Sequence, residues 1–178
     1  MKKRAFRKTS LARLGSLSWQ KRYIGDKKVN KALYCLVKAE AARSVMLYVP
    51  LALEVNVLPL IRKLRREGIS VWVPFMEGES FRLVKYRLPL ATKKYGVKEP
   101  KFSKQYRKRV IECAIVPIVG TDRSFRRIGF GKGMYDRFFA KHNKEIGQVI
   151  FAQRLLCWSS ALITNDYDVK ADVIVTAE

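Results

Sequence analysis

Three alternating glycines, at 129, 131 and 133, stand with several charged residues in the segment 118–139 (IVGTDRSFRRIGFGKGMYDRFF), which joins an apolar run to a predicted helix. Gly129, Gly131 and Gly133 allow backbone conformations that other residues avoid, so that N–H groups can come close to an anion. A helix that begins at about Gly133 or Met134 would add the positive end of its dipole. The segment is therefore typical of a phosphate-binding loop.

The charged side chains of this segment suit the same ligand. Arg126, Arg127 and Lys132 would supply countercharge to phosphate oxygens. Asp136, just past the loop, could hold a magnesium ion that bridges those oxygens. The pattern is neither a Walker-type GxxxxGK motif nor GxGxxG, so the P-loop and dinucleotide-binding families are not indicated. Glycine-rich turns are also common between strands and helices without any ligand, and the spacing alone leaves that alternative open.

The elements that must position this segment follow from the hydrophobic pattern. Short β-rich runs at 44–49 and 69–75 enclose a predicted helix at 57–67. A strand, a helix and a strand in such close succession form a βαβ unit, which requires parallel strands. Further apolar strands are predicted at 111–119 and 145–151. The predicted fold class is α/β, with a mostly parallel sheet and helices on both faces.

The rest of the chain completes one predicted domain over residues 1–178, without repeats or a linker. The remaining predicted elements are, in order, two helices, an edge or hairpin strand, two loops and a short last strand, at 2–17, 27–43, 81–87, 88–105, 161–172 and 173–176. The segment at 88–105 contains prolines and a glycine and lacks periodicity, which favours a loop.

Two further places hold side chains that could bind a ligand. Glu54 lies between the carboxyl end of a predicted strand and the next helix, where open α/β sheets bind ligands. A solvated carboxylate at a helix start is the competing interpretation. Lys3 and Arg7 are four residues apart, so they lie on one face of the first predicted helix. From periodicity alone, a solvated basic face is the simpler interpretation of that pair.

The formal net charge of the chain is +22, from 37 basic and 15 acidic residues. Such an excess attracts polyanions, whether nucleic acid, nucleotide phosphates or a polyglutamate tail. The basic residues are scattered from Lys2 to Lys170. This distribution favours a solvated surface over a binding groove, so no specific nucleic acid partner is expected.

The cysteine content and the hydropathy of the chain indicate the expected cellular location of the protein. The three cysteines, at 35, 113 and 157, are odd in number and far apart, so neither a disulfide framework nor a paired-cysteine metal site is indicated. No apolar segment has the length of a signal peptide or a membrane span. A cytoplasmic protein with no membrane partner is expected.

Motifs spread over nearly the whole chain resemble those of the 5-formyltetrahydrofolate cyclo-ligase family, also called 5,10-methenyltetrahydrofolate synthetases. The strongest, VPIVGTDRSFRRIGFGKGMYDRF, is similar to the family's pattern of VP, a few residues, D, then GxR, L or I, and GxGxGxYD. The others are KRAFR, EV, VP, YGVKEP, AQ, DVKAD and VTAE, at 3–7, 54–55, 73–74, 95–100, 152–153, 168–172 and 175–178. Their order and spacing also agree with the family.

The resemblance implies a three-layer α/β/α fold with a Rossmann-like sheet and an ATP- and Mg²⁺-dependent enzyme. Its reaction would convert 5-formyltetrahydrofolate, with or without a polyglutamate tail, to 5,10-methenyltetrahydrofolate with release of ADP and phosphate. The formyl oxygen on N5 would attack the γ-phosphoryl group, N10 would close on the activated carbon, and phosphate would leave. Phosphoryl transfer depends mainly on positioning and charge stabilisation, which explains why no Ser/His/Asp or Cys/His arrangement is present. A monomer is expected.

The resemblance also assigns site residues by position. The expected catalytic charges are those of Arg127 and Lys132. The expected ATP-binding residues are Lys3, Arg7, Arg127, Gly129, Phe130, Gly131, Lys132, Gly133, Met134 and Tyr135. The expected magnesium-associated carboxylates are Asp136 and Asp168. The expected substrate-binding residues are Glu54, which would orient the pterin, Met76 and Tyr95.

Two other classes remain open. The charge of +22 suggests a basic nucleic-acid-associated protein, whose affinity for its partner should fall steeply with salt. A nucleotide- or folate-binding relative that has lost turnover would bind the same ligands without forming methenyltetrahydrofolate. An activity assay separates both classes from the enzyme.

Overall fold

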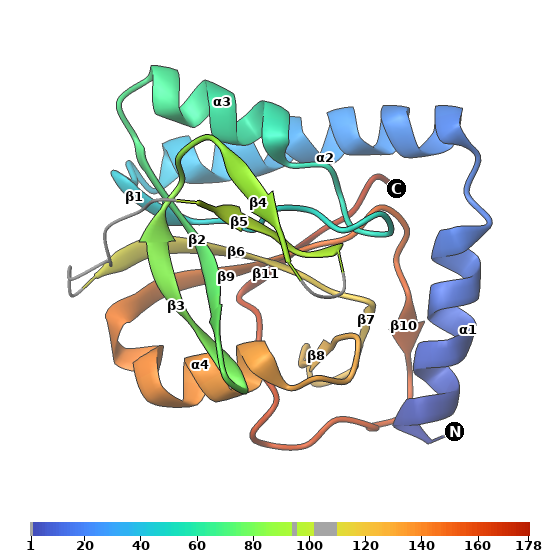
Figure 1. The fold of residues 1–178 in the computed structure, drawn as a ribbon. Helices are drawn as coiled ribbons and strands as arrows, with labels where there is room; N and C mark the ends of the chain where they lie inside the picture. Colours follow the sequence, from blue (N-terminus) through green and yellow to red (C-terminus); the bar gives the residue numbers. More distant parts are fainter. Residues whose placement is uncertain (1, 94–95, 102–109) are drawn as a thin grey trace.

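The computed structural model describes residues 2–93, 96–101 and 110–178, and its centre is a six-stranded sheet (Figure 1). The strands of this sheet are β1 (Ser44–Met46), β2 (Ser70–Glu77), β3 (Ser80–Lys85), β6 (Ile111–Pro117), β9 (Ile146–Ala152) and β11 (Val173–Val175). Their order is β11-β9-β6-β1-β2-β3. All neighbouring pairs are parallel except β2 and β3, which form an antiparallel hairpin at the edge. The predicted mostly parallel sheet and its edge hairpin are thereby confirmed.

Helices cover both faces of this sheet (Figure 1). They are α1 (Lys3–Gly15), α2 (Trp19–Ala39), α3 (Leu58–Arg66) and α4 (Met134–His142), the last followed by the short 3₁₀ helix η2 (Asn143–Glu145). The helices α2 and α3 pack on one face of the sheet and α4 on the other, which gives three layers. The helix α1 stands at one end of the layers, where Phe6 and Leu14 pack with Ile128 and Cys157.

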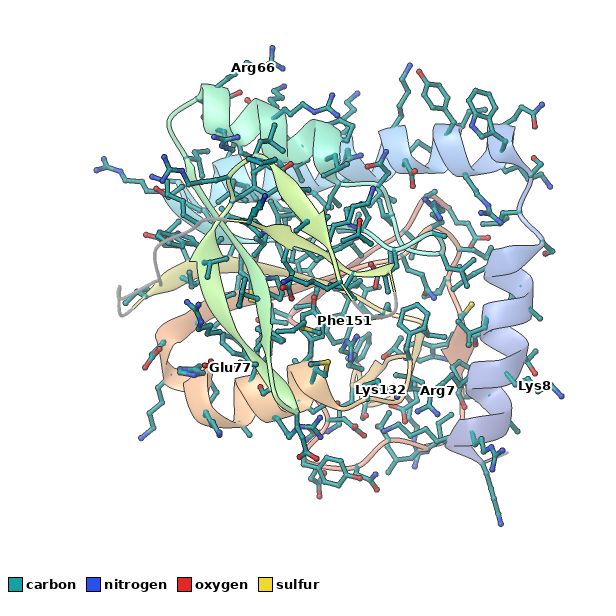
Figure 2. All side chains as sticks on the ribbon, viewed as in Figure 1. Arg7, Lys8, Arg66, Glu77, Lys132 and Phe151 are labelled. Carbon is teal, nitrogen blue, oxygen red and sulfur yellow. The ribbon has the colours of Figure 1, made fainter. Side chains whose placement is uncertain are left out.

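Alternate residues of the central strands supply the two cores. Val45 and Cys113 pack in the core beneath α2 and α3, whereas Met46 and Ala114 pack in the core beneath α4. The strands read as unbroken apolar runs because successive side chains point to opposite faces and both faces are covered. Phe151 is fully buried, while basic side chains such as Lys8 and Arg66 project from different sides of the molecule (Figure 2).

Two small sheets contain strands that the hydrophobic pattern did not predict. They are formed by β4 (Leu90–Thr92) and β5 (Lys98–Pro100), and by β7 (Gly120–Asp122), β8 (Arg127–Ile128) and β10 (Trp158–Ser159). The prediction of a loop over 88–105 is therefore wrong at 90–92 and 98–100. Glu99 is buried and accepts a hydrogen bond from the backbone N–H of Met76 at 2.7 Å, which ties this hairpin to β2. Such a contact leaves no local pattern in the sequence.

The helix α2 also begins eight residues before the predicted start at 27. Ser18 caps it, because its side chain accepts a hydrogen bond from the N–H of Lys21 at 3.3 Å. The helix continues through Gly25, where a Cβ atom would lie 3.3 Å from Ala177, so the glycine permits close contact with the C-terminal segment. Across the described ranges, no helix has both the length and the apolar character needed to cross a membrane.

Candidate active site

The predicted phosphate-type loop joins β8 to α4. Gly131 has a φ of 100° and Gly133 a φ of 64°, left-handed conformations that favour glycine. Gly133 directly precedes the first turn of α4, so the N-terminus of that helix opens at the loop. Arg137 holds the loop in place, because Nη2 donates to the carbonyl of Lys132 at 2.6 Å and the same guanidinium donates to the carbonyl of Glu79 in the turn between β2 and β3.

The glycines also leave space for two arginine side chains. A Cβ atom at position 129 would lie 2.3 Å from Nη1 of Arg127, and one at Gly131 would lie 3.2 Å from Nη1 of Arg7. Arg7 reaches the loop from α1 and donates from Nε to the carbonyl of Gly129 at 2.7 Å. Two guanidinium groups therefore lie directly against the loop because positions 129 and 131 have no side chain.

Arg127 is the more buried of these two arginines, with 6% of its surface exposed. Its Nε donates to the carbonyl of Pro117 at 3.0 Å. Its guanidinium carbon lies 4.5 Å from the centroid of the Tyr135 ring. These contacts fix both the position and the plane of the guanidinium. An oriented, buried positive charge stabilises an anion more effectively than one in water.

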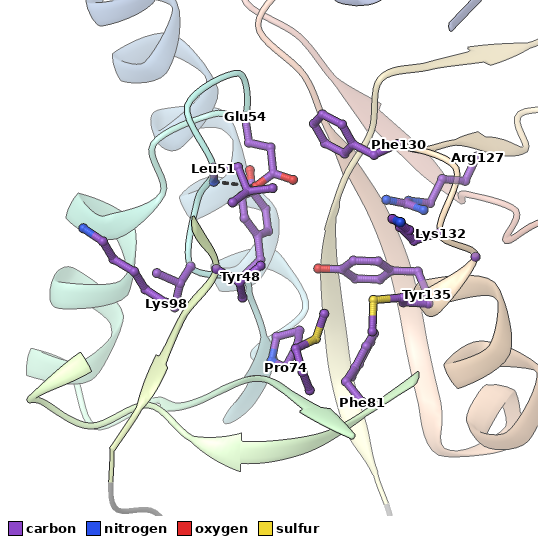
Figure 3. Close-up of a pocket in the computed structure, with 15 residues that line it drawn as sticks. Tyr48, Leu51, Glu54, Pro74, Phe81, Lys98, Arg127, Phe130, Lys132 and Tyr135 are labelled. Atoms are coloured by element: carbon purple, nitrogen blue, oxygen red, sulfur yellow. Dashed lines mark hydrogen bonds between the residues drawn. The ribbon is translucent and has the colours of Figure 1, made fainter. Parts of the chain in front are cut away.

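A cavity of about 420 Å³ opens beside this loop (Figure 3). The wall formed by the loop carries cationic and aromatic side chains, from Arg127, Phe130, Lys132 and Tyr135. The facing wall carries side chains that follow β1, from Tyr48, Leu51 and Glu54. The remaining lining is mostly apolar and comes from Val49, Pro74, Met76, Phe81, Val97, Lys98, Gly133 and Met134. A ligand in this cavity would meet Arg127 and Lys132 on one side and Glu54, with Lys98 further along the same wall, on the other.

A tight turn holds the carboxyl group of Glu54. Its Oε2 accepts a hydrogen bond from the N–H of Leu51 at 2.8 Å, and its own N–H donates to the carbonyl of Leu51 at 3.0 Å. Burial raises the pKa of Glu54 to about 7, although the Leu51 hydrogen bond and the positive charges of Arg127 and Arg154 oppose that rise. Near neutral pH, both protonation states of Glu54 are therefore accessible.

Two tyrosines of the cavity stay protonated. Burial, and then the charge of Glu54, raises the pKa of both Tyr48 and Tyr135 well above its ordinary value. The Tyr48 hydroxyl donates to the carbonyl of Val55 at 3.1 Å. The Tyr135 ring packs edge-on against Phe81, with centroids 5.0 Å apart. Both rings therefore act as neutral walls at physiological pH.

The two predicted metal ligands, Asp136 and Asp168, are connected through Val169, which follows Asp168 in the chain and bonds to Asp136. Asp136 is partly buried, and its Oδ1 accepts a hydrogen bond from the Val169 N–H at 3.2 Å. Asp168 is 3% exposed, and its oxygens lie 2.7 and 2.6 Å from Nζ of Lys3. Its Oδ2 also accepts from the N–H of Asn165 at 2.7 Å. Within the described residues, no three His, Cys, Asp or Glu side chains gather closely enough to form a metal site on their own.

Asp122, at the end of β7, fixes the loop that leads to Asp168. Its oxygens accept hydrogen bonds from both the N–H and the hydroxyl of Ser124, from the N–H of Ile163, and from the N–H and hydroxyl of Thr164, at 2.6 to 3.0 Å. Burial alone would raise the pKa of Asp122, but these hydrogen bonds outweigh it and hold the pKa well below its usual range. The carboxylate therefore stays ionised and joins the hairpin of β7 and β8 to residues 163–164.

Comparison with known proteins gives this geometry a family. The model of the 5-formyltetrahydrofolate cyclo-ligase family matches residues 1–177. The chain belongs to this family. It is 24% identical over 179 residues to the 5-formyltetrahydrofolate cyclo-ligase of Mycoplasma pneumoniae (strain ATCC 29342 / M129 / Subtype 1), with all of both chains covered. It is also 24% identical to that of Mycoplasma genitalium (strain ATCC 33530 / DSM 19775 / NCTC 10195 / G37), over 97% of this chain and 96% of the relative.

Solved structures of the family share the fold. A 5,10-methenyltetrahydrofolate synthetase from Mycoplasma pneumoniae superposes with a TM-score of 0.81 at 23% identity and covers all of both chains. The synthetase from Aquifex aeolicus superposes with a TM-score of 0.81 at 28% identity, over all of this chain and 91% of that one. The three-layer α/β fold expected from the resemblance is confirmed.

Most of the residues expected from the family resemblance lie at one place. Those that line the cavity are Glu54, Met76, Arg127, Phe130, Lys132, Gly133, Met134 and Tyr135. Arg7, Gly129 and Gly131 adjoin it through the contacts of the two arginines, whereas Lys3 pairs with Asp168. Tyr95 lies outside the described residues. Arg126, expected to supply countercharge, instead donates from Nη1 to the carbonyls of Asp166 and Asp168 at 2.7 and 2.8 Å.

Several cavity residues were not expected from the sequence. Tyr48 lies just beyond the carboxyl end of β1, where open sheets bind ligands, so its position could have identified it. Phe81 and Pro74 belong to strands with ordinary apolar patterns. Such patterns do not distinguish a residue that lines a cavity from one that is buried in the core. Asp122, which does not line the cavity, stands in the strongest motif, but its hydrogen bonds to residues 163–164 could be seen only in the fold.

Proposed function

We propose that this protein converts 5-formyltetrahydrofolate to 5,10-methenyltetrahydrofolate, using ATP and Mg²⁺ and releasing ADP and phosphate. The observation that carries the proposal is the cavity itself, in which a glycine loop with Arg127 and Lys132 faces Glu54 across apolar walls. One side suits a phosphoryl group and the other a flat, polar heterocycle, so that the two substrates would meet in one space. The relatives named as 5-formyltetrahydrofolate cyclo-ligases support this assignment.

The nucleotide would bind along the loop and α1. Backbone N–H groups of the loop and the N-terminus of α4 would surround the phosphates, and Arg127 and Lys132 would supply charge from the cavity wall. Arg7 already lies against Gly129 and Gly131 and would add a third charge at the loop. Lys3, Phe130, Met134 and Tyr135 complete the expected ATP-binding residues.

The residues beside Val169 fit a magnesium ion that is shared with phosphate oxygens. Mg²⁺ is usually bound by one or two carboxylates together with substrate phosphates rather than by a cage of protein ligands. Asp136 suits this role because it is partly exposed and at the start of α4. Asp168 would have to give up its ion pair with Lys3 to bind a metal directly. When bound, the ion would neutralise charge on the transferring phosphoryl group.

The pterin would lie between Glu54 and the apolar walls. An ionised Glu54 could accept hydrogen bonds from adjacent N–H groups of the heterocycle, and its position is set by the turn with Leu51. Met76, Phe81 and Tyr48 would cover the faces of the ring. Tyr95 is proposed to line the same pocket, as the family resemblance implies.

The chemistry then needs orientation and charge more than proton transfer. The formyl oxygen on N5 would attack the γ-phosphorus with ADP as the leaving group, and N10 would then attack the activated carbon and expel phosphate, with the N10 proton passing to the released phosphate or to solvent. Arg127, fixed by Pro117 and Tyr135, is placed to stabilise charge on the transferring group. Neither Arg127 nor Lys132 is proposed to act as a base.

The test is direct. Purified protein is mixed with 5-formyltetrahydrofolate, ATP and Mg²⁺, and the absorbance of methenyltetrahydrofolate is followed together with the release of phosphate. Formation of both products in equal amounts, dependent on ATP, is the expected result. No product over a range of pH and salt would overturn the proposal. Binding of both ligands without product would instead identify a relative that has lost turnover.

The charge of +22 keeps one second candidate, a basic protein that associates with nucleic acid. The same charge would also favour substrates with a polyglutamate tail. Affinity for a single-stranded oligonucleotide that falls steeply with salt, in a protein without turnover, would favour the nucleic-acid function. A lower KM for the polyglutamylated substrate would favour the enzyme.

A further inference from the structure

Asp26 and Arg154 form a two-pronged ion pair that the proposed reaction does not use directly. Nε of Arg154 lies 2.7 Å from Oδ1 of Asp26, and Nη2 lies 3.0 Å from Oδ2. Both side chains are largely buried, with 7% of Arg154 and 14% of Asp26 exposed. A buried pair of this kind contributes little net stability once the cost of removing both charges from water is counted. The pair therefore matters more for the position of the residues that it contacts than for the stability of the fold.

The third contact of Arg154 reaches the wall of the cavity. Nη1 donates to the carbonyl of Ala52 at 3.2 Å. Ala52 lies inside the turn that the reciprocal hydrogen bonds of Leu51 and Glu54 close. The Arg154 guanidinium therefore links Asp26 on α2 to the backbone of the turn.

The fold brings these residues together from three distant segments. Asp26 lies on α2, next to Gly25, whose missing side chain lets the helix approach the C-terminal segment. Arg154 follows β9 closely, and its carbonyl accepts a hydrogen bond from Ala177 at 3.4 Å. Because α2 and the end of β9 both belong to the rigid layers, the pair links the Glu54 turn to the frame of the fold.

The pair also acts on Glu54 through charge. The positive charges of Arg127 and Arg154 lower the pKa of Glu54, against the larger effect of burial. Among the described residues, the same cavity also contains the cationic Lys98 and Lys132 and the two tyrosines Tyr48 and Tyr135, which remain neutral. Loss of Arg154 would therefore move the turn and also raise the pKa of its carboxyl group.

We propose that Asp26 and Arg154 are positioning residues for the folate substrate, which hold the 51–54 turn so that the Glu54 carboxyl faces the pterin. This inference rests on the proposed function, because it takes Glu54 as the pterin-binding group. It predicts a selective defect: loss of the pair should weaken the folate and leave the nucleotide, which binds on the opposite wall, unaffected.

The test compares Asp26→Asn, Arg154→Gln and Arg154→Lys with the control Glu67→Gln. The control removes the ion pair between Glu67 and Lys38. Lys38 lies on α2, as Asp26 does, but this pair is more exposed than the pair of Asp26 and Arg154 and does not contact the 51–54 turn. Binding of 5-formyltetrahydrofolate is measured by calorimetry, and KM is measured for both substrates. The Asp26→Asn and Arg154→Gln chains should bind the folate about tenfold more weakly, with KM for ATP within about twofold of the wild type. Arg154→Lys keeps the positive charge but cannot form both hydrogen bonds to Asp26. It takes the place of Arg154→Gln in these measurements if the Arg154→Gln protein does not fold.

Two further readouts separate positioning from general loss of structure. Hydrogen exchange of the amides at 51–55 should be faster in Asp26→Asn than in Glu67→Gln, whether or not any ligand is bound. The acidic limb of kcat/KM for the folate, which reports Glu54, should move to higher pH in Arg154→Gln. Unchanged folate affinity in folded variants, or equal losses for folate and ATP, would overturn the inference. Absence of turnover in the wild type would overturn the proposed function instead, and the exchange measurement would still test the geometry.

Discussion

Nζ of Lys3 lies 2.7 and 2.6 Å from the two carboxylate oxygens of Asp168, so the first helix is joined to the loop before the last strand. The pair ties the N-terminal basic residues to the loop that Asp122 also anchors. Asp168 is consequently already engaged, whereas Asp136 is bonded only on Oδ1 among the described contacts. This difference predicts that Asp136, rather than Asp168, would contact a metal ion directly.

We expect Asp136→Asn to raise the Mg²⁺ concentration for half-maximal rate by about tenfold, because a direct metal contact is weakened. Asp168→Asn should instead raise KM for ATP, since Lys3 loses its partner. Rates are measured against Mg²⁺ at saturating ATP. Asp166→Asn, in the same loop but fully exposed, is the control. Equal shifts in the metal titration for both variants would show that Asp168 is a ligand too.

Removal of the Arg127 guanidinium tests the charge on the cavity wall. Arg127→Ala should cut turnover by about 100-fold or more, as loss of a charge that stabilises the transferring group does elsewhere. Arg127→Lys should recover little, because lysine cannot reproduce both the hydrogen bond to Pro117 and the stacking on Tyr135. The exposed Arg123, replaced by alanine, serves as control. Near-normal turnover in Arg127→Ala would exclude it from catalysis.

Gly131 should be needed for tight ATP binding, because of both its backbone conformation and the space that it leaves for Arg7. Gly131→Ala combines an unfavourable φ of 100° with a methyl group 3.2 Å from Nη1 of Arg7. We expect KM for ATP to rise by about tenfold while the folate affinity changes little. Gly78→Ala has a positive φ of 58° but open space around the methyl group, so it should leave both constants unchanged. The contrary result, similar kinetics for the two variants, would mean that the space left for Arg7 has no functional role.

Glu54→Gln should weaken the folate more than ATP, and it should also change how stability depends on pH. The pKa of Glu54 is about 7 in the folded chain and about 4.3 in an unfolded one. The folded state therefore holds the proton more tightly, and the contribution of Glu54 to stability is lost as pH rises from the lower value through the higher. Glutamine does not titrate, so the variant should gain Tm relative to the wild type by a few degrees between about pH 4 and pH 8. Scanning calorimetry at both pH values checks this, and a constant Tm difference would contradict it.

The parts of the fold that could be predicted are those with a local cause. The unit of β1, α3 and β2 could be predicted because two short β-rich runs and a proline near the helix start are visible within one short stretch. The hairpin of β4 and β5 depends on the buried Glu99 bonding to β2, a contact between segments that no window contains. The early start of α2 was hidden by Gly25, which reads as a helix breaker until the C-terminal segment packs against it.

The site divides in the same way. The glycine loop and Glu54 could be predicted because their positions at strand and helix ends have a chemical meaning. The pair of Asp26 and Arg154 could not, since nothing local relates residues 128 positions apart. Charge alone predicted that Arg126 would contribute to the phosphate site. Arg126 adjoins Arg127 in the sequence, but successive side chains of an extended segment point in opposite directions, and its guanidinium bonds to the carbonyls of Asp166 and Asp168.

The contacts of α1 have a consequence for the order of folding. Arg7 meets Gly129 and Lys3 meets Asp168 across separations of 122 and 165 positions in the sequence. Contacts between such distant segments cost more loop-closure entropy than local contacts and form more slowly. We therefore expect α1 to dock late in folding, after the segments that carry Gly129 and Asp168 have formed.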